Sequence, residues 1–265
     1  MFFRNKVILI VALVLLVAGG ITFMLNNVIV FGQNDSKKVI ENPTFSNIEV
    51  ETNNAEVEIV STNGSEATVE YTGAGKRTKV NFDVNVKRDT LSVKLEEKRR
   101  FFFSFGFNSK GLKLTVNLPE EQYESLQVET DNGHISTEDI KVDELSLETD
   151  NGQIHVKNVE TGLAEVESDN GKVIFDHVEG EIKGTLNNGR ITVLTDNLEW
   201  PMDLTTDNGS IEIKTESQPK NVTIDAETDN GRITIFGDKV DRATYGKGKH
   251  VIKLRTDNGS ITVTN

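Results

Sequence analysis

The chain has 265 residues, a net charge of −13 and no cysteine. The lack of cysteine excludes disulfides, thiolate metal sites and cysteine-linked lipid anchors, and the acidic balance argues against nucleic acid as a partner. The charge is uneven, because residues 76–113 hold 11 Lys/Arg and 4 Asp/Glu, whereas residues 114–265 hold 14 and 30. A basic segment therefore precedes an acidic body.

The N-terminal stretch predicts a membrane anchor. Residues 7–25 carry no charge, and as a helix they would span about 28 Å, close to the thickness of the hydrocarbon core. Arg4 and Lys6 precede them, so the positive-inside rule places residues 1–6 in the cytoplasm and the rest of the chain outside. A cleaved signal peptide is the alternative, although no A-x-A-like site follows the apolar run. Residues 26–43 are the expected linker to a domain of residues 44–265.

A repeated architecture is predicted to start near residue 44. Residues 52–55 form a degenerate copy of a turn motif that is complete later in the chain, and apolar residues alternate with polar ones on both sides of it. The distance from Ala55 to Gly133 corresponds to about four periods of the later repeat, and residues 80–95 also alternate with the period of a strand. Residues 61–113 are therefore expected to form further coils that have lost the turn motif.

A basic and aromatic patch interrupts this region. Five phenylalanines within seven residues cannot all occupy one face of a strand. Exposed aromatics behind basic residues suit contact with an anionic membrane face or wall polymer, and a covered solenoid end is an equal alternative. The residues of the patch are Arg99, Arg100, Phe101, Phe102, Phe103, Phe105 and Phe107.

The acidic body is built from a repeat. An Asp-Asn-Gly turn or a close variant occurs seven times, and successive glycines are 19, 19, 18, 20, 22 and 28 residues apart. Position +2 after each glycine is a β-branched apolar residue, and apolar residues alternate on both sides of the turn, which indicates half-buried strands. The turn residues are Asp131, Asn132, Gly133, Asp150, Asn151, Gly152, Asp169, Asn170, Gly171, Asn188, Gly189, Asp207, Asn208, Gly209, Asp229, Asn230, Gly231, Asp257, Asn258 and Gly259.

Two all-β folds fit this repeat. Asn-Gly turns are typical of antiparallel hairpins, whereas identical residues at one phase are expected when coils stack on their own kind. Because asparagine occupies position −1 in all seven repeats, we favour a β-solenoid of 19–20-residue repeats, preceded by one transmembrane helix. Eleven coils would form a rod about 50 Å long.

Each turn residue has an expected structural role. Glycine is expected in a left-handed conformation, aspartate in an Asx-turn, and asparagine in a ladder of side-chain amides. A row of Ca²⁺ ions along the aspartate column stays open as an alternative. One carboxylate per coil is a thin ligand set for that ion, so no cofactor is expected.

The sequence offers no catalytic motif. His134, His155, His177 and His250 fall at different phases of the repeat, so a metal cluster is not expected, and no nucleophile, zincin or P-loop string occurs. The long interval between Gly231 and Gly259 is interpreted as a capping insertion.

One family shares these features. Residues 112–119, residues 126–133 and the N-G-x-I-x-V units resemble the bacterial putative-adhesin domain family, which includes LiaG-like proteins of a cell-envelope stress operon. The resemblance covers roughly residues 44–265. It implies a β-solenoid-like fold, membrane attachment and no catalytic residues.

Function is expected to follow from this architecture. We expect a non-enzymatic, membrane-anchored adhesin-like or scaffold protein that presents a surface to cell-wall polymer or to another membrane protein. A polysaccharide-acting β-helix enzyme and a purely structural spacer are the alternatives, because fold alone does not give function.

Overall fold

The computed structural model describes residues 30–265 except 35, 42, 75–78 and 99–110. Every regular element of these residues is a β-strand, and no helix among them is long and apolar enough to cross a membrane. The expected transmembrane span of residues 7–25 and the basic and aromatic patch lie outside the described residues.

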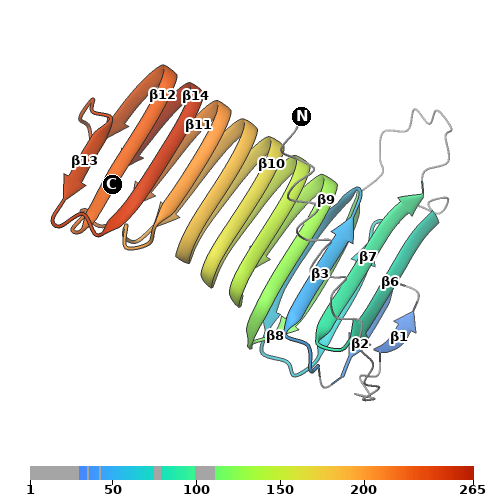
Figure 1. Ribbon diagram of the computed structural model, residues 1–265. Coiled ribbons are helices and arrows are strands. Elements are labelled where there is room, and N and C mark those ends of the chain that lie inside the picture. Colours follow the sequence, from blue (N-terminus) through green and yellow to red (C-terminus); the bar gives the residue numbers. More distant parts are fainter. Residues whose placement is uncertain (1–29, 35, 42, 75–78, 99–110) are drawn as a thin grey trace, which may run out of the picture.

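The strands wind into a solenoid whose coils stack along one axis (Figure 1). The longest strand, β10, runs through three repeats without a break. The strands are β1 Val30–Asn34, β2 Lys37–Ile40, β3 Asn47–Thr52, β4 Ala55–Thr62, β5 Ala67–Thr72, β6 Lys79–Lys87, β7 Thr90–Lys98, β8 Leu112–Pro119, β9 Gln122–Glu138, β10 Lys141–Thr195, β11 Met202–Thr215, β12 Val222–Ile235, β13 Arg242–Tyr245 and β14 His250–Thr264.

Parallel, in-register pairing identifies the fold as a solenoid rather than a meander of hairpins. β9 pairs with β10 so that Asn132 faces Asn151 and Gly133 faces Gly152. β10 pairs with β11 in the same way, with Asn188 facing Asn208. The expectation of an all-β solenoid is therefore confirmed for the described residues.

The coils are not stacked in chain order at the C-terminal end. β14 lies between β11 and β12, and it is parallel to both. After β12 the chain reverses in β13, which pairs antiparallel with β12, and then returns to fill the space beside β11 (Figure 1). The 28-residue interval thus supplies a cap and a return path.

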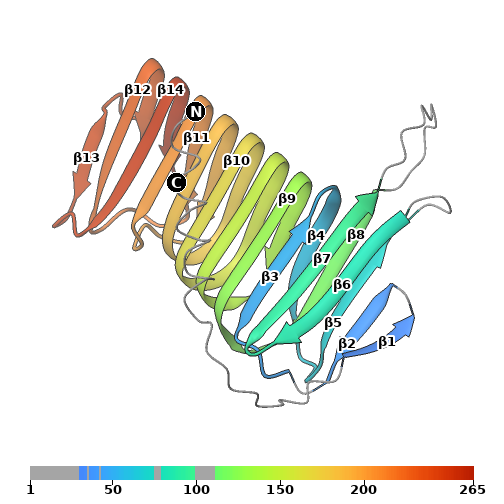
Figure 2. The same ribbon diagram turned by 45° about the vertical axis from the view of Figure 1, so that its right-hand side comes forward.

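The N-terminal end of the stack differs from the expected eleven successive coils. β3 and β4 pair directly with β9, although about four repeat lengths of chain separate them. β7 and β8 form the next coil, parallel to β3 and β4, and β6 and β5 close the stack antiparallel to them (Figure 2). Residues 61–119 therefore contain one coil, of β7 and β8, and the cap strands β5 and β6, because antiparallel strands end a stack instead of extending it.

The cap also uses part of the expected linker. β1 and β2 lie within residues 26–43, and β2 pairs antiparallel with β5. Val39 and Ile40 of β2 are buried. This part of the chain adds apolar surface to the N-terminal end of the core.

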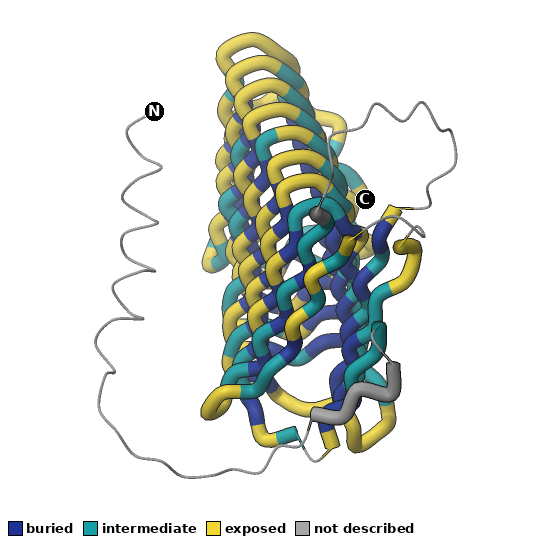
Figure 3. Tube along the Cα trace, turned by 90° about the vertical axis from the view of Figure 1, so that its right-hand side faces the viewer, coloured by how far each residue is buried: buried dark blue, intermediate teal, exposed yellow. Residues whose placement is uncertain are grey.

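The core is a single apolar column inside the stack. The alternating residues of each coil point inward, and the turns carry the exposed residues (Figure 3). Gly184 breaks the apolar pattern where Phe175, the largest fully buried side chain, needs room. A Cβ at Gly184 would lie 3.4 Å from the Phe175 ring and 3.1 Å from the Leu204 side chain. The exception in the repeat is therefore a packing compensation.

Close approach of neighbouring backbones requires the repeat glycine. A Cβ on Gly171 would lie 1.7 Å from the carbonyl oxygen of Gly152, and one on Gly209 would lie 1.6 Å from that of Gly189. The φ angles of Gly152, Gly171 and Gly189 are +159°, +156° and +147°, in a positive region that other residues rarely adopt. The expected glycine-favouring conformation is thus confirmed at these three turns, and glycine is also needed for the space between coils.

Replacing this glycine tests the constraint. We expect Gly171→Ala to lower the free energy of unfolding by about 3 kcal/mol, because the added methyl group must push two coils apart. Thermal denaturation of the two proteins measures the change. Gly111→Ala is the control, since nothing lies within 4 Å of a Cβ at Gly111. Equal effects of the two substitutions would contradict the close-approach account.

Candidate functional site

The solenoid has two edges of different character. The repeat edge is formed by the Asp-Asn-Gly turns, and its residues recur at the same phase in successive coils. The variable edge is formed by the turns on the other side, at residues 61–63, 120, 139–141, 158–160, 177–179, 196–201 and 216–221, where both length and residue type change from coil to coil. A binding site for an irregular ligand needs such departures from the repeat.

An asparagine ladder runs along the repeat edge. Asn170 Nδ2 donates to Asn151 Oδ1 at 3.1 Å, and Asn188 Nδ2 donates to Asn170 Oδ1 at 3.0 Å. The ladder follows the spatial order of the coils through the reordered C-terminal end, and it extends to the degenerate coil. The other donor–acceptor pairs are Asn132–Asn54, Asn151–Asn132, Asn208–Asn188, Asn258–Asn208 and Asn230–Asn258.

The aspartate column lies beside this ladder. Asp131, Asp150, Asp207, Asp229 and Asp257 are exposed, and Asp169 accepts a 2.7 Å hydrogen bond from Asn187 Nδ2. Among the described residues, the group of three His, Asp or Glu side chains with ligand atoms close enough for one ion lies at the variable edge. The calcium row along the aspartate column stays an alternative.

A glutamate column flanks the repeat edge. Glu51 faces Glu129, and Glu129 faces Glu148 in the next coil. Burial raises the pKa of the Glu148 carboxyl, and the charges of Glu129 and Glu167 raise it further. The pKa values of Glu129 and Glu167 are also raised, chiefly by burial. When the carboxyl groups of this column are ionised, they lower the stability of the folded state.

The protein is expected to gain stability as the pH falls from 7.5 towards 4.5. The folded pKa values of these glutamates lie above the ordinary value for glutamate, so the folded state takes up protons first and is favoured as they bind. Glu148→Gln should raise the free energy of unfolding at pH 7.5 by about 0.5 kcal/mol, a value discounted for solvent screening, and flatten the pH dependence. Thermal denaturation across this pH range measures both. A variant that is less stable at pH 7.5 would contradict the assignment.

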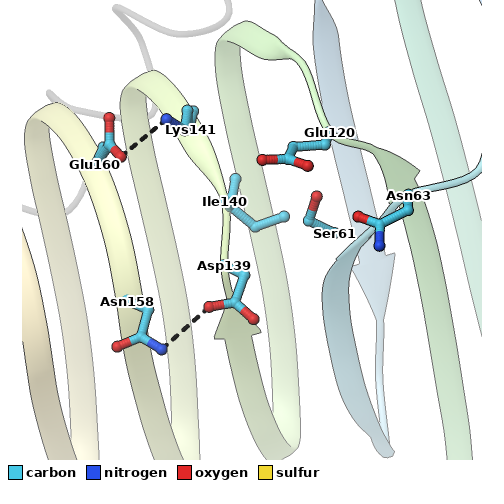
Figure 4. Close-up of a pocket in the computed structure, with 8 residues that line it drawn as sticks. All are labelled: Ser61, Asn63, Glu120, Asp139, Ile140, Lys141, Asn158 and Glu160. Carbon is cyan, nitrogen blue, oxygen red and sulfur yellow. Dashed lines mark hydrogen bonds and ion pairs between the residues drawn. The ribbon is translucent and has the colours of Figure 1, made fainter.

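Two polar grooves lie along the variable edge. The first groove has a volume of about 440 Å³ and is lined by Ser61, Asn63, Glu120, Asp139, Ile140, Lys141, Asn158 and Glu160. Figure 4 shows that these side chains come from turns of neighbouring coils, with hydroxyl, amide, ammonium and carboxylate groups around the buried Ile140. The groove therefore offers donors and acceptors for hydrogen bonds over an apolar floor.

Specific contacts hold the first groove in shape. Lys141 Nζ lies 2.9 Å from Glu160 Oε1, and this contact raises the pKa of Lys141. Asn158 Nδ2 donates to Asp139 Oδ1 at 3.1 Å. Asp139 and Asn158 both have left-handed backbones, with φ of 58° and 51°, a conformation that Asp and Asn tolerate. Consecutive turns are thus linked by side chains as well as by the strands.

The second groove lies nearer the C-terminal end. It also measures about 440 Å³, and its lining residues are Asn197, Leu198, Glu199, Ser217, Gln218, Pro219, Lys220, Asn221 and His250. Trp200, the only tryptophan in the chain, follows Glu199 and is 42% exposed. An exposed indole next to a polar groove is a ready contact surface for an amphipathic ligand.

The sequence did not single out the variable edge. Its turns carry Asp139, Asn158, His177, Asp196 and Glu216 at position +6 or +7 after successive repeat glycines. That column was detectable, but its residue type changes at almost every step. Of the expected site residues, the structure brings the asparagines and glycines together along the repeat edge.

Comparisons with known proteins identify a family and find solved structures with some similarity. The family model described as Toastrack DUF4097 matches residues 45–181 and 128–264, and no curated protein matches the chain at a significant level. A putative cell adhesion protein from Clostridium sporogenes is similar in structure, with 17% identity and a TM-score of 0.41 over 86% of this chain and 97% of the other. A putative adhesin from Bacteroides fragilis has 11% identity and a TM-score of 0.42 over 86% and 95%.

Proposed function

We propose that this chain, which belongs to the Toastrack DUF4097 family, is a non-enzymatic, adhesin-like binding protein held at the outer face of a membrane. The observation that carries the proposal is the difference between the two edges. The repeat edge uses its side chains to join coil to coil, whereas the variable edge holds two open polar grooves. Family membership agrees with the sequence resemblance to putative adhesins.

The proposed ligand is the glycan of the cell wall. The first groove presents a hydroxyl, two amides and three carboxylates, which can pair with sugar hydroxyls. The body of residues 114–265 carries 30 acidic and 14 basic residues, so long-range repulsion disfavours a polyanionic polymer. A neutral or weakly charged glycan avoids this repulsion.

The proposed orientation places the N-terminal cap next to the membrane. Residues 7–25 would form the anchor, and β1 and β2, which come next among the described residues, pair with the cap. Lys79, Lys87 and Arg88 are exposed at the β6–β7 hairpin of the cap, where they would face the anionic membrane surface. The acidic coils would then extend away from the membrane, and a link to the envelope-stress response, as in LiaG-like proteins, is part of the same proposal.

Co-sedimentation with cell wall tests this function. The purified chain in detergent is mixed with isolated Gram-positive wall, and the bound fraction is measured against wall concentration. We expect saturable pelleting. Replacing the groove carboxylates by amides (Glu120→Gln, Asp139→Asn and Glu160→Gln) should weaken binding about tenfold, which corresponds to about 1.4 kcal/mol of lost hydrogen bonding.

A variant with the same change of charge at the repeat edge is the control. Asp131→Asn, Asp150→Asn and Asp207→Asn also remove three exposed carboxylates, and they should leave binding unchanged. Equal losses in both variants would reduce the interaction to net charge and contradict the groove assignment. Release of reducing sugar ends from the wall in the same samples would instead support a polysaccharide-acting enzyme.

A further inference from the structure

Each turn of the variable edge holds one polar residue at the same position, and these residues stack from coil to coil. In successive coils this position is Asp139, Asn158, His177, Asp196 and Glu216, at intervals of 19, 19, 19 and 20 residues. Neighbouring coils in a β-solenoid are about 4.8 Å apart. Side chains at one turn position can therefore converge on a common point, provided that their chemistry is complementary.

His177 is held between two carboxylates. Its Nδ1 atom lies 2.6 Å from Asp176 Oδ1, and its Nε2 atom lies 3.1 Å from Asp196 Oδ1. Asp176 also lies 3.7 Å from His155 Nε2, through its other oxygen. Asp176 thus fixes the orientation of the His177 ring, and Nε2 is directed at the next coil. A carboxylate behind the imidazole is the usual support of a metal-binding histidine.

Glu216 completes a group of three ligands. One nitrogen of His177 and one carboxylate oxygen each of Asp196 and Glu216 all lie within 4.8 Å of one another. The ligand atoms of a tetrahedral Zn²⁺ site are about 3.4 Å apart, given bonds of about 2.1 Å. All three side chains are exposed, so small rotations can close this difference, and an ion can enter from solvent.

The composition of the group decides which cation it suits. An imidazole nitrogen with carboxylate oxygens is a ligand set for transition metals, whereas Ca²⁺ and Mg²⁺ prefer oxygen alone. We propose that His177, Asp196 and Glu216 bind one divalent transition cation such as Zn²⁺, with Asp176 as a positioning residue and the remaining coordination positions open to solvent. The ion joins three successive coils, and Asp196 and Glu216 directly precede Asn197 and Ser217 of the second groove.

Metal titration of the intact chain tests this site. The untagged, chelator-treated protein in detergent is titrated with Zn²⁺ by calorimetry, and a parallel titration with Co²⁺ follows the visible absorption that reports nitrogen and oxygen ligation. We expect one Zn²⁺ per chain, a raised Tm in the presence of the ion, and no comparable effect of Ca²⁺ at the same concentration.

Variants locate the ion. His177→Asn preserves the turn, since Asn158 adopts the same backbone conformation one coil earlier, and it should weaken Zn²⁺ binding at least tenfold and abolish the Co²⁺ absorption band. Glu216→Gln should also weaken binding. His134→Asn, at the repeat edge, should have no effect. Absence of saturable Zn²⁺ binding, or binding that is unchanged in His177→Asn, would overturn the proposal.

Discussion

Contact between the backbones of successive repeat turns is the constraint on which the rest of the structure depends. Each repeat glycine lies so close to the carbonyl of its neighbour that no Cβ fits, and this spacing lets the asparagine amides meet at 3.0–3.3 Å. Register follows directly, because a slip of one residue would place a side chain in that contact and turn the apolar face outwards. One edge of the molecule is thereby committed to holding the stack together.

The ends of the stack show how the array is terminated. An open end would expose a row of unpaired backbone groups. Here the N-terminal end carries the antiparallel strands β5 and β6, and the C-terminal end carries the antiparallel strand β13. Because β14 returns between β11 and β12, the last residues of this sequence lie inside the array rather than at its tip. The degenerate coil of β3 and β4 is likewise enclosed. The coil of β7 and β8 covers one side of it, and β9 covers the other. The termini of the array are thus protected from fraying.

The features that could be predicted from the sequence are those that recur in every repeat. The columns at Asn170 and Gly171 predicted parallel stacking, because identical residues at one phase need neighbours of their own kind. The order of the coils was not predictable, since a shared motif does not say which copies are adjacent. The group around His177 was missed because turns of different length shift Asp196 and Glu216 by one position. The anchor at residues 7–25 stays a prediction.

Disulfide cross-linking tests the reordered, in-register stack most directly. The chain has no cysteine of its own, so engineered pairs are its only thiols. Thr262 of β14 faces Glu212 of β11 on one side and Thr234 of β12 on the other. We expect Glu212→Cys with Thr262→Cys to form a disulfide on oxidation, because paired strands bring Cα atoms within reach. Glu212→Cys with Thr234→Cys should not form one. Cross-linking of the second pair without the first would contradict it.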